Sequence, residues 1–264
     1  MKTQHLQPLL TIIAKYVVHV CMSALYIPSH FMLMIPIPYS RPVHLIYISN
    51  VSTVRLHTTT LRSALASATR ETATQLESGL HTTTNPAICA AELDAPIFSI
   101  VNGMTFVLVR LASLEQLREV KSSRLDVDML VADFLDEGWR DSLVGRYYYV
   151  DVDEDGNEKE VGSDDEGGKD EGARYLRTRM MGEGIEDPAT GSAASALSAY
   201  LTLTREKASR AFRITQGVEM GRRSVISVET TAVKEDGDEV KLADVKLGGT
   251  AVVVMQGTLT VDEE

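Results

Sequence analysis

The residues best suited to chemistry in this sequence lie in one short segment, Glu186-Asp187-Pro188-Ala189-Thr190-Gly191-Ser192. Pro188 stiffens the approach to a helix that is expected to begin at Gly191, where small residues take over. The first N–H groups of a helix have no intrahelical acceptor, and together with the helix dipole they attract anions. Gly191 lacks the Cβ that would hold a ligand away from these groups, so a substrate carboxylate could dock there.

Asp187 is the acidic side chain beside that helix start. A carboxyl group next to an electropositive helix end can hold or move a proton, which is the task of a general acid–base catalyst. Thr190 or Ser192 can cap the helix. A simpler interpretation is that Asp187 and Ser192 do nothing more than cap it, and for an isolated string of this kind the simpler interpretation is favoured.

The helix itself is expected to be buried. Of the nine residues 191–199, eight are Gly, Ala or Ser, and Leu197 is the exception. Because such small side chains let other backbone approach closely on every side, the helix suits a central position with strands wrapped around it.

Strand patterns lie on both sides of this helix in the sequence. Runs rich in β-formers at 97–100 and 106–111 flank Asn102-Gly103, a hairpin signal, with Met104 and Thr105 expected to lengthen the turn. Further strands are expected at 146–152, 177–181, 212–214, 224–228, 240–247 and 250–255, with glycines at 217, 221, 248, 249 and 257 breaking the chain. Short strands separated by tight turns indicate a curved sheet, which could close as a wall around the helix.

Three other helices are expected. Ser113 and Gln116 form a capping box that opens a short helix from Leu114 to about Val120. Apolar residues recur at helical spacing over 127–135 and stop at Gly138, which predicts an amphipathic helix. Ala, Leu, Glu and Arg content favours one more helix over about 61–76.

The acidity of the chain is concentrated in one segment. The net charge is -11, and residues 151–172 hold eleven acidic residues and two lysines, so -9 of that charge lies there. Nucleic-acid binding is excluded as improbable, because no dense run of Lys and Arg exists to neutralise phosphates. A calcium loop is also rejected, because Gly162 stands where the EF-hand pattern requires a bidentate Glu. The segment is interpreted as a turn at 154–157 followed by a solvated acidic insertion.

The first 94 residues differ in texture from the rest. Residues 9–34 form an apolar stretch, but Lys15, Pro28 and several His and Ser residues interrupt it, so a membrane anchor is a less favoured alternative to a chain without a span. Residues 52–86 are rich in Thr, Ser and Ala. Two cysteines without a CxxC spacing indicate free thiols in a reducing compartment, which predicts a cytoplasmic protein with no metal site.

The segment 186–194, followed by Ala196-Leu197 and Tyr200-Leu201, resembles the signature of the phenazine-biosynthesis isomerase family, the PhzF-like relatives of diaminopimelate epimerase. The similarity extends upstream to Val101-Asn102-Gly103 and Arg179-Met180. Downstream it takes in 216–222 with Ser224, then 248–252 and Gly257, so that it covers about residues 95–262 in the family's order. This specificity argues against a capping role alone for Asp187.

The resemblance implies an α+β fold of the diaminopimelate epimerase type, a curved sheet or barrel around a central helix. The family's members have two such halves, with the active site between them. Only the C-terminal half is recognisable here, so the chain is divided into an atypical segment 1–94 and a PhzF-like domain 95–264 that carries the acidic insertion 151–172. A homodimer is one reasonable assembly.

The resemblance also implies a function. Family members use no metal or organic cofactor and shift a proton between carbons of a small carboxylated metabolite. By position, Asp187 is the acidic residue that binds substrate and assists proton transfer, while Thr190, Gly191 and Ser192 form the substrate-binding helix start. The family's first-half Glu and its Gly-His-Ala-Thr string do not occur in this sequence. The alternative is therefore a catalytically inactive remnant or small-carboxylate binding protein.

Overall fold

The structure is a computed structural model. It describes residues 46–48, 54–57, 60–63, 85–121, 135–140, 142–159, 172–182, 184–204, 209–234 and 240–249. Two sequence predictions lie outside these residues: the strand 250–255 and the apolar stretch 9–34. Of the amphipathic helix predicted over 127–135 only Leu135 is described, and residues 160–171 of the acidic insertion also lie outside. Of the helix predicted over 61–76, only residues 61–63 are described, and they are helical.

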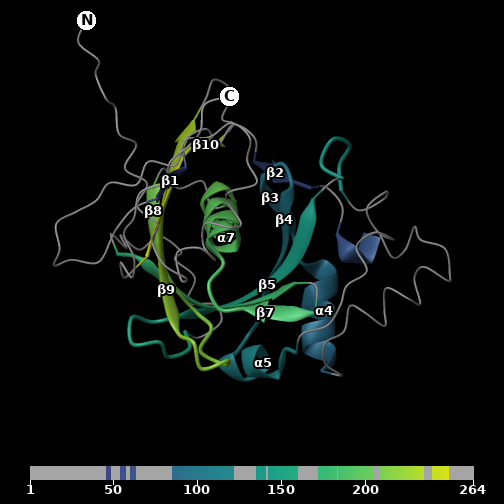
Figure 1. Ribbon diagram of the computed structural model, residues 1–264, viewed down its shortest axis with the longest axis vertical. Coiled ribbons are helices and arrows are strands. Elements are labelled where there is room, and N and C mark those ends of the chain that lie inside the picture. Colours follow the sequence, from purple (N-terminus) through teal and green to yellow (C-terminus); the bar gives the residue numbers. More distant parts are fainter. Residues whose placement is uncertain are drawn as a thin grey trace, which may run out of the picture.

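One large sheet forms the body of the molecule (Figure 1). Its strands are β1 (Ile46–Ile48), β2 (Arg55–Leu56), β3 (Ile97–Val101), β4 (Met104–Arg110), β5 (Leu143–Val152), β6 (Arg174–Gly182), β7 (Ile185–Asp187), β8 (Ser209–Gln216), β9 (Ser224–Lys234) and β10 (Val240–Gly249). The order across the sheet is β1-β10-β9-β8-β6-β5-β4-β3-β2, and β7 pairs with β6 beyond the end of β8. Pairing is antiparallel except for β4 with β5 and β6 with β8.

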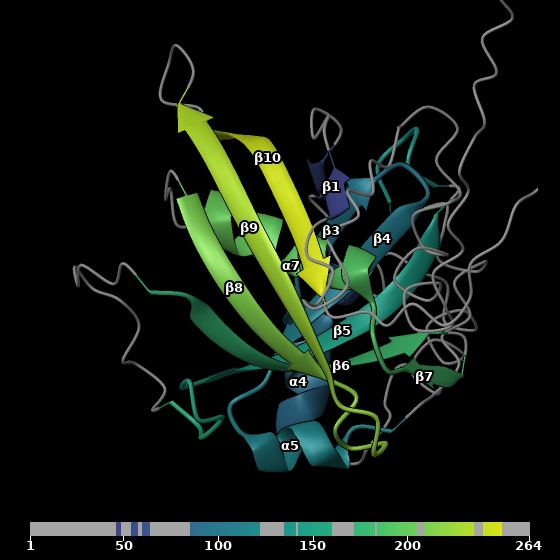
Figure 2. The ribbon, with the colours of Figure 1, turned by 60° about the vertical axis from the view of Figure 1, so that its left-hand side comes forward.

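The sheet curls around a single helix, α7 (Gly191–Leu203) (Figures 1 and 2). The helix contacts β9 and β10 towards one end of the strand order and β3 and β4 towards the other. An element that touches both ends of a sheet can do so only if the sheet is strongly bent. The α+β architecture expected from the sequence, a curved sheet around a central helix, is therefore what the structure shows.

The composition of α7 explains why it can occupy the centre. Eleven of its residues are buried, and they are mostly Ala and Ser. Side chains from the concave face of the sheet fill the space around it, among them Phe106, Phe212 and Leu176, all almost fully buried. Small residues on the helix and large residues on the strands give the dense packing that protein interiors require.

The convex face of the sheet is covered on one side by two short helices, α4 (Pro86–Asp94) and α5 (Leu114–Glu119). They close a second apolar cluster that includes Ile88, Leu117 and Tyr148. The capping box is confirmed: the Ser113 hydroxyl accepts from the Gln116 N–H at 3.1 Å, while the Gln116 side chain reaches back to the Ala112 N–H at 2.9 Å.

The first predicted hairpin is present, but its turn is shorter than expected. Met104 and Thr105 are the first residues of β4, so the turn consists of Asn102 and Gly103 alone. The prediction that they lengthen the turn was wrong, because both side chains are buried and pair across the hairpin with β3. Gly103 has φ 92°, a conformation that glycine adopts without strain.

The strand predicted over 240–247 changes in extent. β10 runs to Gly249, so Gly248 and Gly249 lie inside a strand that pairs with β9, and they do not interrupt it. The turn at 154–157 is confirmed: the Asp153 carboxylate accepts from the Asn157 N–H at 2.8 Å, and Val152 pairs with Glu158.

No helix of the described residues is long and apolar enough to cross a membrane.

Candidate functional site

The segment that carries Asp187 is delivered by a tight hairpin. β6 ends at Gly182, Gly184 adopts φ 82°, and β7 returns antiparallel to β6, with Asp187 opposite Met180. The chain then passes through Pro188 and Ala189 into α7. Asp187 therefore occupies a fixed position where a strand ends and the central helix begins.

The Asp187 carboxylate is held by its own loop. One oxygen, Oδ2, accepts a hydrogen bond from the Thr190 hydroxyl at 2.7 Å, and the other, Oδ1, accepts from the Ala189 N–H at 3.2 Å. Asp187 is partly exposed, whereas Thr190 is 3% exposed. Both oxygens act as acceptors, as carboxylate oxygens do.

Gln216, at the end of β8, ties this loop to the sheet. Its Nε2 donates to the Asp187 backbone carbonyl at 2.7 Å and to Thr190 Oγ1 at 3.0 Å. Its Oε1 accepts from the Tyr147 hydroxyl at 3.0 Å and from the Thr190 N–H at 3.4 Å. The Tyr147 hydroxyl also contacts Thr178 Oγ1 at 3.0 Å. Gln216 is fully buried, so these contacts satisfy its amide.

Tyr147 is held in its protonated form by its surroundings. Burial raises the pKa of its hydroxyl well above the usual range, and the negative charge of Asp187 adds to the effect. A neutral phenol donates one hydrogen bond. Tyr147 therefore acts as a fixed donor within the polar cluster beneath Asp187.

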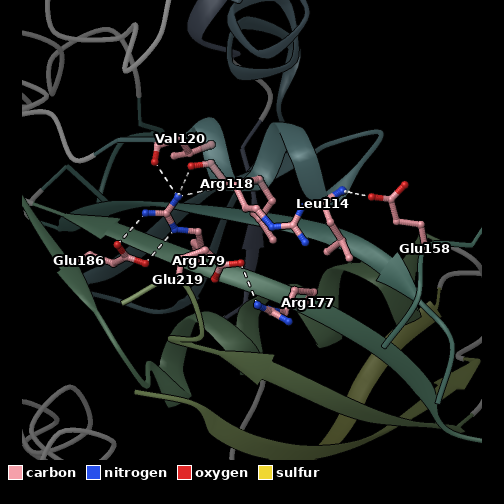
Figure 3. A network of polar contacts seen from close by, with 9 residues as sticks. Leu114, Arg118, Val120, Glu158, Arg177, Arg179, Glu186 and Glu219 are labelled. Carbon is pink, nitrogen blue, oxygen red and sulfur yellow. Dashed lines mark hydrogen bonds and ion pairs between the residues drawn. The ribbon is translucent and has the colours of Figure 1, made fainter. Parts of the chain in front are cut away.

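Two ion pairs link β6 to neighbouring segments of the chain (Figure 3). Arg179 forms a bidentate pair with Glu186 of β7, at 2.8 and 2.7 Å. Arg177, two residues earlier on the same strand, binds Glu219 in the turn after β8 at 2.9 Å. Glu186 directly precedes Asp187, so the pair with Arg179 holds β7 in place immediately before Asp187.

The turn after β8 packs directly on the Asp187 segment. Gly217 has φ 75°, and a Cβ at this position would lie 2.4 Å from the Arg222 carbonyl oxygen and 2.8 Å from the Pro188 carbonyl oxygen. Only glycine therefore fits. The Gln216-Gly217 pair, which the sequence marked as a break in the chain, thus packs against Asp187 and Pro188.

The start of α7 differs in detail from the expectation. Thr190 is the N-cap residue, but its side chain makes no capping hydrogen bond: the hydroxyl accepts from Gln216 Nε2 and donates to Asp187. The Ser192 hydroxyl does not cap the helix either: it is buried without a hydrogen-bond partner among the described residues. Thr190 therefore lies at the N-cap position, but the prediction that its side chain or that of Ser192 caps the helix was wrong. The Thr190 side chain is instead held by Asp187 and Gln216, which are brought to it by the tertiary structure.

The first N–H groups of α7 remain available in the sense the sequence suggested. The first intrahelical bond runs from the Ala194 N–H to the Thr190 carbonyl at 3.0 Å. The N–H groups of Gly191, Ser192 and Ala193 therefore have no intrahelical acceptor. The structure brings Asp187, Thr190, Gly191 and Ser192 together at one helix end. In the part of the chain that the structure describes, no cluster of acidic, His and Cys side chains has a geometry for a metal ion.

Sequence reasoning assigned no role to Gln216 or Tyr147. Gln216 carried a weak signal, because it belongs to the segment matched to the family and immediately precedes the Gly217 turn. Tyr147 carried none: in a run of three tyrosines, Tyr147 to Tyr149, only the tertiary structure shows which hydroxyl reaches Gln216.

Comparison with known protein families gives one match. The family model described as phenazine biosynthesis-like protein matches residues 171–257, which include β6, β7, α7, β8, β9 and β10. The C-terminal region of the chain is therefore PhzF-like, as its motifs indicated. Comparison of the sequence with curated proteins found no match.

Several solved structures match parts of this chain. A phenazine biosynthesis protein of the PhzF family from Bacillus anthracis is 14% identical, with a TM-score of 0.45 over 82% of this chain and 64% of that one. A "predicted epimerase" from Pseudomonas aeruginosa is 15% identical, with a TM-score of 0.46 over 83% and 58%. A PhzF family protein from Enterococcus faecalis is 17% identical, with a TM-score of 0.33 over 71% and 51%. The chain thus spans about half to two thirds of the length of these structures.

Proposed function

We propose that this protein catalyses a cofactor-independent proton shift on a small carboxylated metabolite, with Asp187 as an acid–base group. The observation that carries the proposal is the Asp187 carboxylate, which accepts from Thr190 and Ala189 at the start of the central helix. A carboxylate kept as an acceptor can take a proton from a substrate carbon and return it to another.

The helix start supports recognition of the substrate. The N–H groups of Gly191, Ser192 and Ala193 have no intrahelical acceptor and lie at the positive end of the helix dipole. The buried Ser192 hydroxyl also has no partner among the described residues, and such groups are normally satisfied by a bound water or ligand. A substrate carboxylate bound there would receive hydrogen bonds from several donors at once.

In the proposed reaction, the C–H bond of a carbon close to the substrate carboxylate breaks and its proton moves to Asp187. The electron pair stays on the substrate, delocalised towards its unsaturated groups. The proton is then delivered to a different carbon, and Asp187 is ionised again. No oxidation or reduction occurs, so acid–base groups suffice for the chemistry.

A non-catalytic protein that binds small carboxylates is the second candidate. It is favoured by the engagement of both Asp187 oxygens within their own loop, a pattern that also suits a structural role. In that case the helix start would still bind a carboxylate, but Asp187 would exchange no proton with it.

Proton exchange with solvent distinguishes the two candidates. The purified protein would be incubated in D2O with a panel of small β,γ-unsaturated carboxylates, in which a proton can move between carbons, and loss of the C–H signals followed by 1H NMR. The proposal expects deuterium incorporation into at least one compound. Asp187→Asn should abolish it, whereas Asp155→Asn, in the exposed turn of the acidic loop, should leave it unchanged.

Binding without exchange would support the second candidate. Calorimetry with the same panel would then show heats of binding in the wild type while the NMR signals persist. An exchange rate unaffected by Asp187→Asn would refute the role of Asp187 in the first proposal.

A further inference from the structure

We infer that Gln216 is a positioning residue: its side-chain amide orients the Thr190 hydroxyl so that this hydroxyl can only donate to Asp187, and thereby keeps Asp187 ready to accept a proton. The inference rests on the proposed function for its catalytic consequence. Its structural content, the control of Asp187 by Gln216, stands on the hydrogen bonds alone.

The orientation of the Gln216 amide is fixed by two backbone groups. The Asp187 carbonyl oxygen can only accept, so the group 2.7 Å from it must be the Gln216 NH2. The Thr190 N–H can only donate, so the group 3.4 Å from it must be the Gln216 oxygen. Both constraints select the same orientation of the Gln216 amide. Neither backbone group can exchange its role as donor or acceptor, so the amide cannot be assigned the other way round.

The direction of every other bond in the cluster follows from that orientation. The Gln216 NH2 donates to Thr190 Oγ1 at 3.0 Å, so the Thr190 hydroxyl already acts as an acceptor there and its one proton is available for Asp187 Oδ2. The Tyr147 proton is directed at Gln216 Oε1, so Thr178 must donate to the Tyr147 oxygen. The chain of donors therefore runs from Thr178 through Tyr147 to Gln216 and from Gln216 through Thr190 to Asp187.

Removal of the amide would release this control. Without the Gln216 amide, the Thr190 hydroxyl could rotate, and the loop would lose its bonds at the Asp187 carbonyl and the Thr190 N–H. Of the contacts to the partly exposed Asp187 carboxylate described above, the bond from the Ala189 N–H at 3.2 Å would then be the one left in place. A misplaced catalytic group lowers turnover more than it lowers ground-state binding.

The test compares Gln216→Met, an apolar residue of similar length, with Tyr147→Phe and Thr178→Val. The first removes the donors to the Asp187 loop. The second leaves those donors and removes one bond to Gln216 Oε1. The third leaves all contacts of Gln216 in place. Graded effects in the order Gln216→Met, Tyr147→Phe, Thr178→Val are expected, and urea unfolding of each variant establishes that it is folded.

Two readouts are measured. The first is amide hydrogen exchange of Ala189 by NMR in the ligand-free protein. The Ala189 N–H donates to Asp187 Oδ1 and is not among the hydrogen-bond partners of Gln216 in the described residues, so it reports on the carboxylate. The second is the D2O exchange reaction, in which kcat should fall about 10- to 100-fold with KM changed by less than about twofold. Ala189 exchange should accelerate by about tenfold or more in Gln216→Met.

An unchanged rate of Ala189 amide exchange in a folded Gln216→Met variant would overturn the inference. Effects of Thr178→Val on the two readouts as large as those of Gln216→Met would overturn it as well. If Gln216→Met does not fold, the same two readouts in Tyr147→Phe decide whether the Gln216 amide positions Asp187. If the wild type exchanges no proton with any compound, the proposed function fails, and Ala189 exchange still decides whether Gln216 positions Asp187. The two failures are therefore distinguishable.

Discussion

The guanidinium of Arg179 binds both carboxylate oxygens of Glu186, at 2.8 and 2.7 Å, and its remaining nitrogen donates to the carbonyls that end helix α5. Figure 3 shows the resulting bridge from α5 across β6 to β7. The Arg179 side chain is 8% exposed and that of Glu186 is 15% exposed, so the pair is largely shielded from water. Arg179 therefore couples a helix on the convex face to the residue immediately before Asp187.

Arg179→Met should destabilise the protein strongly. The substitution leaves the Glu186 carboxylate and three α5 carbonyls without their donor, and breaking a shielded pair on one side costs about 3 kcal/mol. Urea unfolding would measure the change. The matched control is Arg62→Met: Arg62 pairs with Asp94 on the exposed surface, so its loss should be much smaller. Equal effects of both substitutions would contradict the structural role given to Arg179.

The protein should lose stability as the pH falls, in part through His57. His57 Nε2 contacts Ser99 Oγ at 2.8 Å, and its Nδ1 accepts from the Asp136 N–H at 3.3 Å, which assigns the neutral form with the proton on Nε2. Burial lowers the pKa of His57 below its ordinary 6.5, against the opposing influence of Asp136, while Arg55 adds to the lowering.

The direction of this pH dependence follows from the difference in proton binding between the folded and the unfolded protein. At a pH below 6.5, the ordinary pKa of histidine, the unfolded chain binds a proton at His57 more readily than the folded protein does. The free energy of unfolding therefore decreases as the pH falls through about 6.5 and below. Urea unfolding from about pH 8 to about pH 5 should show a smaller decrease in His57→Gln than in the wild type. Parallel pH dependence in both proteins would show that His57 does not contribute.

Gly217→Ala should damage both stability and the site. An alanine Cβ would meet the carbonyl oxygens of Arg222 and Pro188, and the positive φ adds backbone strain of about 1 kcal/mol or more. Gly221→Ala is the matched control, because Gly221 has φ 71° but nothing within 4 Å of a Cβ. The difference between the two variants isolates the clash with the Pro188 segment. We expect Gly217→Ala alone to abolish D2O exchange.

Ala196→Leu should destabilise the centre of the fold. Ala196 is fully buried in α7, where the sheet surrounds the helix, so extra methyl groups must displace packed side chains at a cost of about 1–3 kcal/mol or more. Thermal unfolding would measure it. The same substitution at Ala90, on the exposed side of α4, should change stability little. A tolerated Leu at 196 would contradict the close packing around α7.

Local patterns identified several elements because local forces dominate them. The Ser113 capping box, the Asn102-Gly103 turn and the run of small residues in α7 each depend on contacts or conformations within a few residues. For the same reason, the sequence located Asp187, Thr190, Gly191 and Ser192 at one helix start. The length of β10 could not be predicted, because pairing with β9 keeps Gly248 and Gly249 in a strand despite their low β-propensity.

The sequence by itself determined the central helix, the segment at its start and the PhzF-like character of the C-terminal region, since these reside in composition and short-range order. Only the tertiary structure decided what the Thr190 hydroxyl does. Gln216 and Tyr147 lie 26 and 43 positions from Thr190 along the chain, and the pairing of β5 and β8 on either side of β6 brings them together beneath it. The partners of the Thr190 hydroxyl, and with them the direction of its one proton, are therefore set by neighbours distant in the sequence, which no local pattern identifies.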